Sequence, residues 1–285
     1  MIYQWFPGHM TKTLRQISEQ LKLIDLVIEI ADARIPMSSR NPELDTMARG
    51  RSRIIVLGKI DLADPEATKA WMDYYRRQGI LPYACDLRNN KSLASLMPLI
   101  REACAGKIAR DRRKGIMNRP IRAMVAGIPN VGKSTFINSF SGSRSLKTGN
   151  KPGVTKGRQW IRINSEVELM DTPGLLWPRF EDQTVGEKIA LIGSMPDDIL
   201  NREELALDLI RVLETTSTGK LKARYEVPED ENFAAVLEGI ALRRGCLKKG
   251  GEPDTEKAAG VLLDDFRSGR IGRITLDACP EEAHD

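Results

Sequence analysis

The chain has 285 residues, of which 41% are hydrophobic and 29% are charged, and it carries a net charge of +5. This composition excludes a wholly disordered chain, and the length leads us to expect two domains with cores of their own. No apolar run approaches the roughly 20 residues of a membrane span, and the first residues lack a signal-peptide pattern, so we expect a cytoplasmic protein without membrane association.

The first part of the chain alternates between helical and strand patterns. Apolar residues at three- to four-residue spacing predict an amphipathic helix from Met10 to Leu21. Further elements are predicted by the same criteria, with strands at 26–30, 53–57 and 80–84 and helices at 65–77 and 92–105. Strands rich in β-branched residues and separated by helices indicate a parallel sheet with crossover connections, which is an α/β fold.

The later part of the chain adds strands and then becomes wholly helical. Residues 106–120 have no apolar periodicity and are expected to form an exposed basic connection. A strand at 121–126 runs into a glycine-containing loop and a helix, and a strand pair is expected at 160–163 and 167–170. Beyond residue 178 four segments repeat apolar residues at helical spacing, so we predict two domains, an α/β domain at 1–178 and an all-α domain at 179–285. Gly245 and Gly269 are expected after helix C-caps, and Asp254 or Thr255 at a helix start.

Basic residues are unevenly distributed, and the cysteines are scattered. Between positions 101 and 122 there are eight Lys or Arg and two acidic residues, and a second basic set lies between Arg243 and Arg273. Each set fits either a solvated surface or a polyanionic partner such as RNA. The four cysteines form no CxxC pair, which predicts reduced thiols and neither a zinc site nor a disulfide framework.

The loop after the strand at 121–126 carries the pattern GxxxxGK[ST], from Gly127 to Ser134. Between a strand and a helix, this pattern places backbone N–H groups and a helix N-terminus around the phosphates of a nucleotide. Lys133 is expected to neutralise charge on the β- and γ-phosphates, and the Ser134 hydroxyl to ligate Mg²⁺. The nucleotide contacts predicted in this P-loop are Asn130, Val131, Gly132, Lys133, Ser134 and Thr135.

Two further motifs would complete a nucleotide site. Asp171-Thr-Pro-Gly174 follows a predicted strand, so Asp171 is expected to hold Mg²⁺ through water and the Gly174 N–H to approach the γ-phosphate. Lys59 and Asp61 follow another strand, where a carboxylate can pair with the N1 and N2 donors of guanine but not with adenine. Taken alone, Asp61 also fits a strand-end cap or a turn residue.

The base motif precedes the P-loop, and this order, together with the flanking residues, resembles the bacterial ribosome biogenesis GTPase A family (YlqF type). The matching segments span nearly the whole chain and are 4–10, 32–36, 40–42, the P-loop, 152–155, 171–174, 176–178 and 266–270. The resemblance implies a P-loop GTPase domain with circularly permuted motif order, followed by a small all-helical domain. It also implies GTP or GDP with Mg²⁺ and K⁺ as ligands, and a precursor of the large ribosomal subunit, with its rRNA and proteins, as the partner.

The resemblance implies three roles that the residues alone do not show. Thr155, otherwise a loop hydroxyl, would meet Mg²⁺ and the γ-phosphate, and Asn130, otherwise a turn residue, would bind K⁺ beside the phosphates. Leu175 and Leu176 stand where many GTPases have a water-orienting glutamine, and neither side chain can hydrogen-bond water. His9 lies in the matched segment 4–10, and the resemblance implies that it serves catalysis near neutral pH, the alternative being that it packs the N-terminal loop.

The base motif departs from the family pattern Asn-Lys-x-Asp, because Gly58 replaces the asparagine. The missing amide usually tethers the base loop to the P-loop region. Guanine preference is therefore expected to persist with affinity weaker by about 1–3 kcal/mol, and Gly58→Asn to tighten GDP and GTP binding. The backbone N–H that meets guanine O6 is expected from Ala84 or Cys85, and the sequence does not choose between them.

Together these features predict a GTPase that binds a late large-subunit precursor and hydrolyses GTP faster on the ribosome. The alternative is a nucleotide-gated RNA-binding placeholder in which hydrolysis is incidental. A third hypothesis, a P-loop ATPase or kinase, is disfavoured because no second substrate pocket is recognisable in the sequence.

Overall fold

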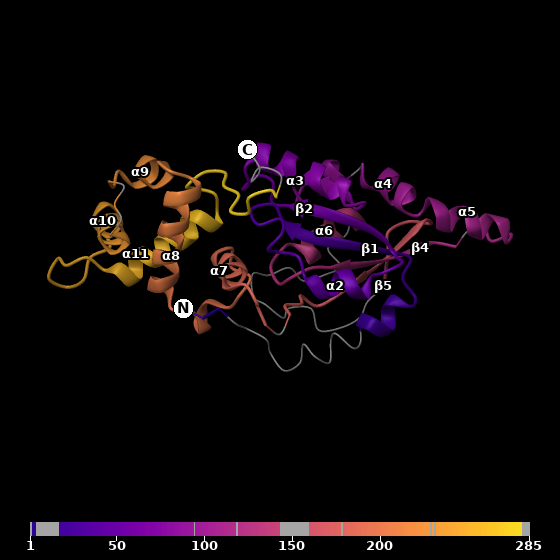
Figure 1. The fold of residues 1–285 in the computed structure, drawn as a ribbon, viewed down its shortest axis with the longest axis horizontal. Helices are drawn as coiled ribbons and strands as arrows, with labels where there is room; N and C mark the ends of the chain where they lie inside the picture. Colours follow the sequence, from indigo (N-terminus) through magenta and orange to yellow (C-terminus); the bar gives the residue numbers. More distant parts are fainter. Residues whose placement is uncertain are drawn as a thin grey trace.

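The computed structural model describes residues 2–3, 17–93, 95–117, 119–142, 160–177, 179–228, 230 and 232–280. The molecule is elongated, with a sheet and its surrounding helices at one end and a group of helices at the other (Figure 1). Residues 17–21 are helical, in agreement with the end of the first predicted helix.

Six strands form one sheet in the order β3-β2-β1-β4-β6-β5. They are β1 (Leu26–Asp32), β2 (Ser52–Gly58), β3 (Leu81–Ala84), β4 (Ile121–Ala126), β5 (Trp160–Arg162) and β6 (Val167–Asp171). Neighbouring strands are parallel except β5, which runs antiparallel to β6. The predicted parallel α/β sheet is confirmed, and the register pairs Asp32 with Gly58 and Val125 with Asp171 at one edge.

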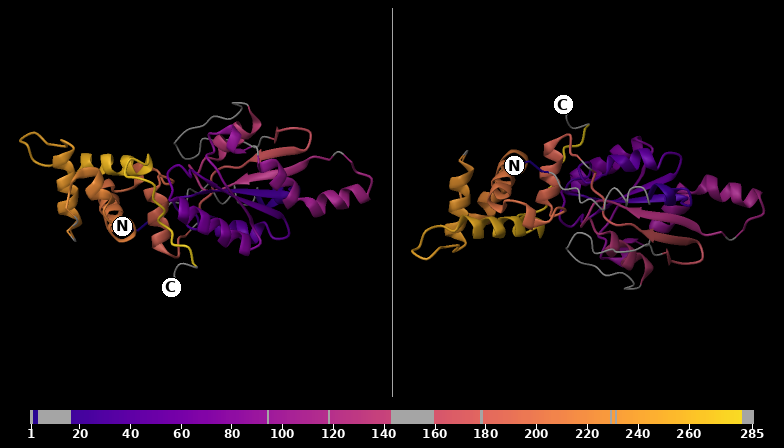
Figure 2. Two further views of the ribbon diagram at one scale, coloured as in Figure 1. Left: turned by 90° about the horizontal axis from the view of Figure 1, so that it is seen from above. Right: turned by 90° about the horizontal axis from the view of Figure 1, so that it is seen from below.

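Helices cover both faces of the sheet (Figure 2). In this domain they are α2 (Pro42–Met47), α3 (Pro65–Arg77), η1 (Asn90–Leu93), α4 (Leu96–Ala103), α5 (Ala105–Arg113) and α6 (Lys133–Ser141). Successive side chains of a strand point to opposite faces of the sheet, so the apolar side chains of β2 pack against the helices on both faces. Ile55 and Leu57 share a buried cluster with Trp71 of α3, whereas Ile54 lies in the larger core with Ile100 of α4.

The region after α3 departs from the prediction. The predicted helix at 92–105 is instead η1 and α4, and the predicted connection at 106–120 contains α5. Cys104 is both the C-cap of α4 and the N-cap of α5. No side chain of α5 is buried, which is why apolar periodicity could not reveal this helix, although Ala, Arg and Lys favour helix formation.

The second group of elements is helical, as predicted. It comprises α7 (Gln183–Leu191), η2 (Asp197–Ile199), α8 (Arg202–Thr216), α9 (Lys220–Tyr225), α10 (Phe233–Arg243) and α11 (Thr255–Arg267). Asp254 caps α11 by accepting from the Lys257 N–H at 3.0 Å, and Gly245 and Gly269 have left-handed φ values of 64° and 77° after α10 and α11. These capping predictions are confirmed. α8 lies at the centre, in contact with α7, α9, α10 and α11.

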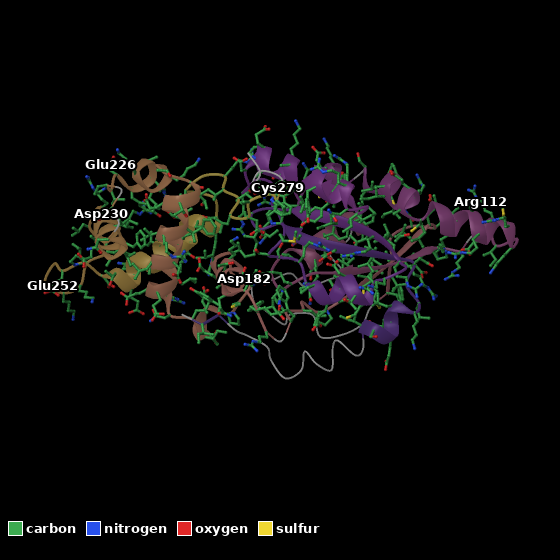
Figure 3. The ribbon with its side chains drawn as sticks, viewed as in Figure 1. Arg112, Asp182, Glu226, Asp230, Glu252 and Cys279 are labelled. Carbon is green, nitrogen blue, oxygen red and sulfur yellow. The ribbon has the colours of Figure 1, made fainter. Side chains whose placement is uncertain are left out.

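After α11 the chain returns to the sheet domain as a strap, defined here as residues 269–280. Arg273 donates to the carbonyls of Ile60 at 2.8 Å and Ala63 at 2.9 Å. Further along, Cys279 is buried in the cluster that contains Trp71 of α3, and its label in Figure 3 lies beside the sheet domain. The strap begins in the predicted helical domain and packs on the other one, and the division into 1–178 and 179–285 stays a prediction.

All four cysteines are buried, and none of them forms a disulfide bond. In the part of the chain that the structure describes, no helix is long and apolar enough to cross a membrane.

Candidate nucleotide site

The predicted motifs come together because parallel strands end at the same edge of a sheet. β4 leads into the P-loop, β6 into Asp171, β2 into Lys59 and β3 into Cys85, and these four strands are parallel. In open α/β sheets, ligands bind outside the carboxyl ends of the strands. The structure therefore places motifs that are more than a hundred residues apart in the chain around one site.

Backbone shape at the P-loop requires its glycines. Gly127 and Gly132 have φ values of 150° and 104°, which side-chain-bearing residues rarely adopt. A Cβ atom at Gly127 would also lie 2.5 Å from the carbonyl oxygen of Ile30 in β1. Gly132 is the N-cap of α6, so the free N–H groups of the first helical turn, which begins at Lys133, face the site as phosphate binding needs.

Lys133 is buried with its ammonium group held inside the P-loop. Its Nζ donates to the carbonyls of Gly127 at 3.1 Å and Ile128 at 2.8 Å. Burial lowers the pKa of Lys133 to about 8, while the charge of Asp171 acts in the opposite direction. A phosphate group beside this ammonium would stabilise its charged form.

The Asp171-Thr-Pro-Gly174 segment runs against the P-loop. Thr172 Oγ1 donates to the Val125 carbonyl at 2.8 Å, and the Leu175 N–H donates to the Gly127 carbonyl at 3.2 Å. A Cβ atom at Gly174 would lie 2.7 Å from Pro129 Cα. This close approach requires glycine and holds the segment at the phosphate end of the site.

Ser134 and Asp171 suit Mg²⁺, which prefers oxygen ligands and is held by one or two protein groups together with nucleotide phosphates. Asp171 is buried at the end of β6, and Ser134 lies in the first turn of α6. Within the described ranges, no three His, Cys, Asp or Glu residues are grouped as a self-sufficient metal site. The donor set therefore fits a metal that arrives with a nucleotide.

The base motif is organised by a buried carboxylate that the sequence did not single out as a site residue. Lys59 adopts a left-handed φ of 59°, and its Nζ lies 2.8 Å from Oδ2 of Asp32. Burial alone would raise the pKa of Asp32, but the charges of Arg34 and Lys59 hold it well below its usual value. Asp61, at the site's edge, accepts from Arg88 Nη2 at 2.7 Å and is partly exposed.

The structure bears on the choice between Ala84 and Cys85. The Cys85 N–H donates to the Leu57 carbonyl at 3.1 Å, which extends the pairing of β3 with β2. Cys85 would have to give up this bond to reach guanine O6. A role for either residue at the base stays a prediction.

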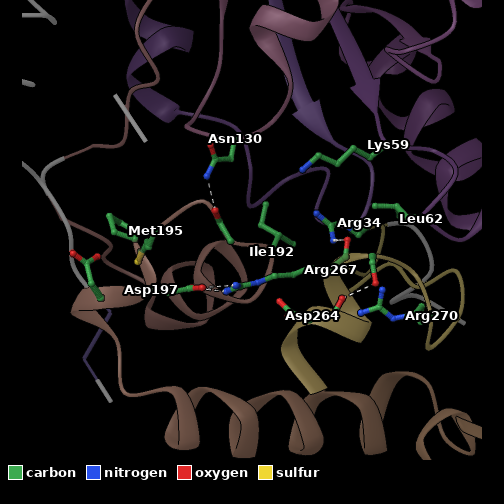
Figure 4. A pocket seen from close by; sticks show the side chains of 14 residues that line it. Arg34, Lys59, Leu62, Asn130, Ile192, Met195, Asp197, Asp264, Arg267 and Arg270 are labelled. Atoms are coloured by element: carbon green, nitrogen blue, oxygen red, sulfur yellow. Dashed lines mark hydrogen bonds and ion pairs between the residues drawn. The ribbon is translucent and has the colours of Figure 1, made fainter. Parts of the chain in front are cut away.

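The P-loop is hydrogen-bonded directly to the turn that follows α7. Asn130 Nδ2 donates to the Gly193 carbonyl at 2.7 Å, and buried Ser194 donates through Oγ to the Pro129 carbonyl at 2.7 Å. Figure 4 shows this contact at the wall of a cavity of about 1090 Å³ between the two domains. Lys59 and Arg34 line the same cavity, with Arg267 on its helical side.

Arg267 fixes this turn from the other side. Its guanidinium donates to the carbonyls of Ala190 and Leu191 at 3.0 Å each and forms a two-pronged ion pair with Asp197 at 2.8 and 2.9 Å. Sequence reasoning noted the 266–270 segment only as a family match and did not assign this role. Capping of the last carbonyls of α7 by an arginine is a contact that depends on tertiary structure.

Two predicted site residues, His9 and Thr155, lie outside the described residues. Leu175 and Leu176 are both buried in the core, in keeping with the expectation that neither orients water. Ser194 and Asp277 were also not predicted from the sequence, because their hydrogen-bond partners are distant in the chain.

The fold and the site define a P-loop nucleotide hydrolase of the GTPase class. Residues 122–232 match a family model described as "50S ribosome-binding GTPase". Ribosome biogenesis GTPase A of Priestia megaterium is 47% identical, over 99% of both chains. Two solved structures, GDP-bound TM YlqF and GNP-bound YlqF from T. maritima, are each 26% identical over 94% of this chain. Their TM-scores are 0.69 and 0.67, and the match extends over 100% and 99% of their own chains. The chain belongs to the ribosome biogenesis GTPase A family.

Proposed function

We propose that this protein is a GTP hydrolase that binds a precursor of the large ribosomal subunit in the cytoplasm and leaves it after hydrolysis. The observation that carries the proposal is the pair of hydrogen bonds between the P-loop and the turn after α7, at Asn130 and Ser194. A change in the P-loop on binding or loss of the γ-phosphate would therefore be transmitted to the helical domain through these two hydrogen bonds. A ribosome-binding surface there would then depend on the nucleotide.

Hydrolysis is assigned to residues of the sheet edge. Lys133 would neutralise phosphate charge, Ser134 would ligate Mg²⁺ and Asp171 would hold it through water. Bound Mg²⁺ would supply charge neutralisation on the phosphates. We assign Thr155 to Mg²⁺ and the γ-phosphate and His9 to the attacking water, both on the strength of the family motifs.

K⁺ beside the phosphates is proposed at Asn130. Donation from Nδ2 to the Gly193 carbonyl fixes the plane of the Asn130 amide, so its Oδ1 has a defined direction. An amide oxygen is a suitable ligand for a hard cation. The helical domain would thus orient a group of the phosphate site.

RNA binding is proposed for the basic end of α5. Arg110, Arg112 and Arg113 are exposed on a helix that buries no side chain, and Lys114 follows them. Figure 3 shows Arg112 at the end of the molecule opposite Glu226 and Glu252. A projecting basic helix suits contact with the phosphate backbone of rRNA.

Co-sedimentation with large ribosomal subunits tests the proposal. Binding in the presence of a non-hydrolysable GTP analogue and release with GDP are expected, with Ser194→Ala weakening this dependence on the nucleotide. Equal binding in both nucleotide states would contradict it. Single-turnover hydrolysis with and without subunits separates the alternative, a placeholder with incidental hydrolysis, because only the proposed GTPase is accelerated by the subunit.

A further inference from the structure

Leu87 lies between the base motif and the P-loop. Its side chain is 4% exposed and belongs to the main core. A Cβ atom built on Gly58 would lie 2.6 Å from Leu87 Cδ1 and 3.0 Å from Cγ, and one built on Gly132 would lie 2.7 Å from the same Cδ1. One methyl group therefore touches the last residue of β2 and the N-cap of α6.

A side chain is prevented at the two glycines for different reasons. Gly132 has a φ of 104°, so its backbone itself disfavours a side chain. Gly58 is not among the positive-φ residues, and it continues the regular pairing of β2 with β1 opposite Asp32. Leu87 is thus the obstacle to a side chain at Gly58, since the next atom, the Ala31 carbonyl oxygen, lies at 3.7 Å.

We propose that Leu87 is a positioning residue for guanine-nucleotide binding, which holds the base motif against the P-loop by packing. In the family pattern an asparagine at position 58 would make this connection with its amide. Here the methyl group of Leu87 occupies the space next to Gly58, so a hydrogen-bonded tether is replaced by an apolar one. The inference rests on the proposed function, because it takes Lys59 and Asp61 as the base motif.

This packing reverses an expectation from the sequence. With Gly58 considered alone, Gly58→Asn should tighten GDP and GTP binding by restoring a tether. With Leu87 in place, the new side chain has to displace a buried leucine that also supports Gly132. Overpacking of this kind pushes the backbone apart, so Gly58→Asn is expected to weaken binding of both nucleotides.

A double-mutant cycle tests the proposal, with the dissociation constants of GDP and GTP as the readout. Leu87→Ala removes the packing and is expected to weaken both nucleotides about tenfold, and Gly58→Asn to weaken them by a similar factor. The double variant provides space for the amide and is expected to bind within about threefold of the wild type. Additive losses in the double variant would overturn the proposal.

Two controls separate positioning from general loss of stability. Leu96→Ala removes a fully buried leucine of α4 in the same core, and its effect should add to that of Gly58→Asn. If Gly58→Asn fails to fold, the milder pair Gly58→Ala and Leu87→Val completes the same cycle, because the Cβ atom alone already meets Leu87. Additivity in this pair also overturns the proposal.

Asp61→Asn distinguishes failure of the base-motif assignment from failure of the proposed role of Leu87. Loss of the preference for GDP over ADP in this variant, together with an additive cycle, would refute the role of Leu87 and leave the base motif intact. An unchanged preference would refute the base motif itself, and the role of Leu87 with it.

Discussion

Asp277→Ala should destabilise the protein strongly, because one buried carboxylate joins the strap to both domains. Its Oδ2 accepts from the Met37 and Ser38 N–H groups at 2.9 and 2.7 Å. Its Oδ1 accepts from the Ser38 hydroxyl at 2.7 Å and from Lys188 Nζ, on α7, at 2.8 Å. Removal of one partner of a buried charged network costs about 3–5 kcal/mol.

Thermal unfolding measures this cost. For a chain of this size about 1 kcal/mol corresponds to roughly 2 °C, so the midpoint should fall by about 6–10 °C. Asp277→Asn keeps one carbonyl oxygen and should lie between the wild type and Asp277→Ala. Asp198→Ala, at an exposed position on η2, is the matched control and should change the midpoint little. A loss for Asp277→Ala no larger than that of the control would refute the reasoning.

Four further outcomes are expected. Lys133→Ala and Ser134→Ala should abolish hydrolysis while the circular dichroism spectrum is retained; normal turnover in a folded variant would remove the P-loop assignment. The affinity for GDP should fall about tenfold between pH 7 and pH 9, because Lys133 loses its proton as the pH rises through about 8 and phosphate binding needs the charged form. If the affinity of Lys133→Met for GDP falls equally steeply with pH, another group is responsible for the effect. Replacement of K⁺ by Na⁺ should slow turnover in the wild type but not in Asn130→Ala, and an ion-indifferent wild type would exclude the proposed K⁺ role. Charge reversal at Arg110, Arg112 and Arg113 should weaken subunit binding and reduce its salt dependence, unlike reversal at Arg243 and Arg244 if α5 is the main contact.

Local sequence patterns predicted most of the fold because burial leaves a periodic signature. The β-branched runs identified the central strands, and the P-loop followed from the spacing of Gly127, Gly132 and Lys133 between a strand and a helix. α5 was missed because none of its residues is fully buried, and α2 and α9, with six residues each, are too short to show a period. The spacing of apolar residues indicates which side chains are buried, so it does not identify helices that are exposed or very short.

The nucleotide motifs could be read from the sequence, whereas the contacts that support them could not. Asp32 pairs with Lys59 only because β1 and β2 are neighbours in register. Leu87, Ser194 and Asp277 act through partners that are brought near by the fold. A leucine after a strand or a serine in a turn has many possible roles, and tertiary structure selects one.

The returning strap determines how this protein can be divided. A chain cut after Trp177 would keep every predicted nucleotide motif, yet it would leave the carbonyls of Ile60 and Ala63 without Arg273 and the N–H groups of Met37 and Ser38 without Asp277. The apolar surface of Trp71 would also lose the cover of Cys279. A working minimal GTPase should therefore be obtained by joining the strap to the chain after Trp177 through a linker, and not by truncation.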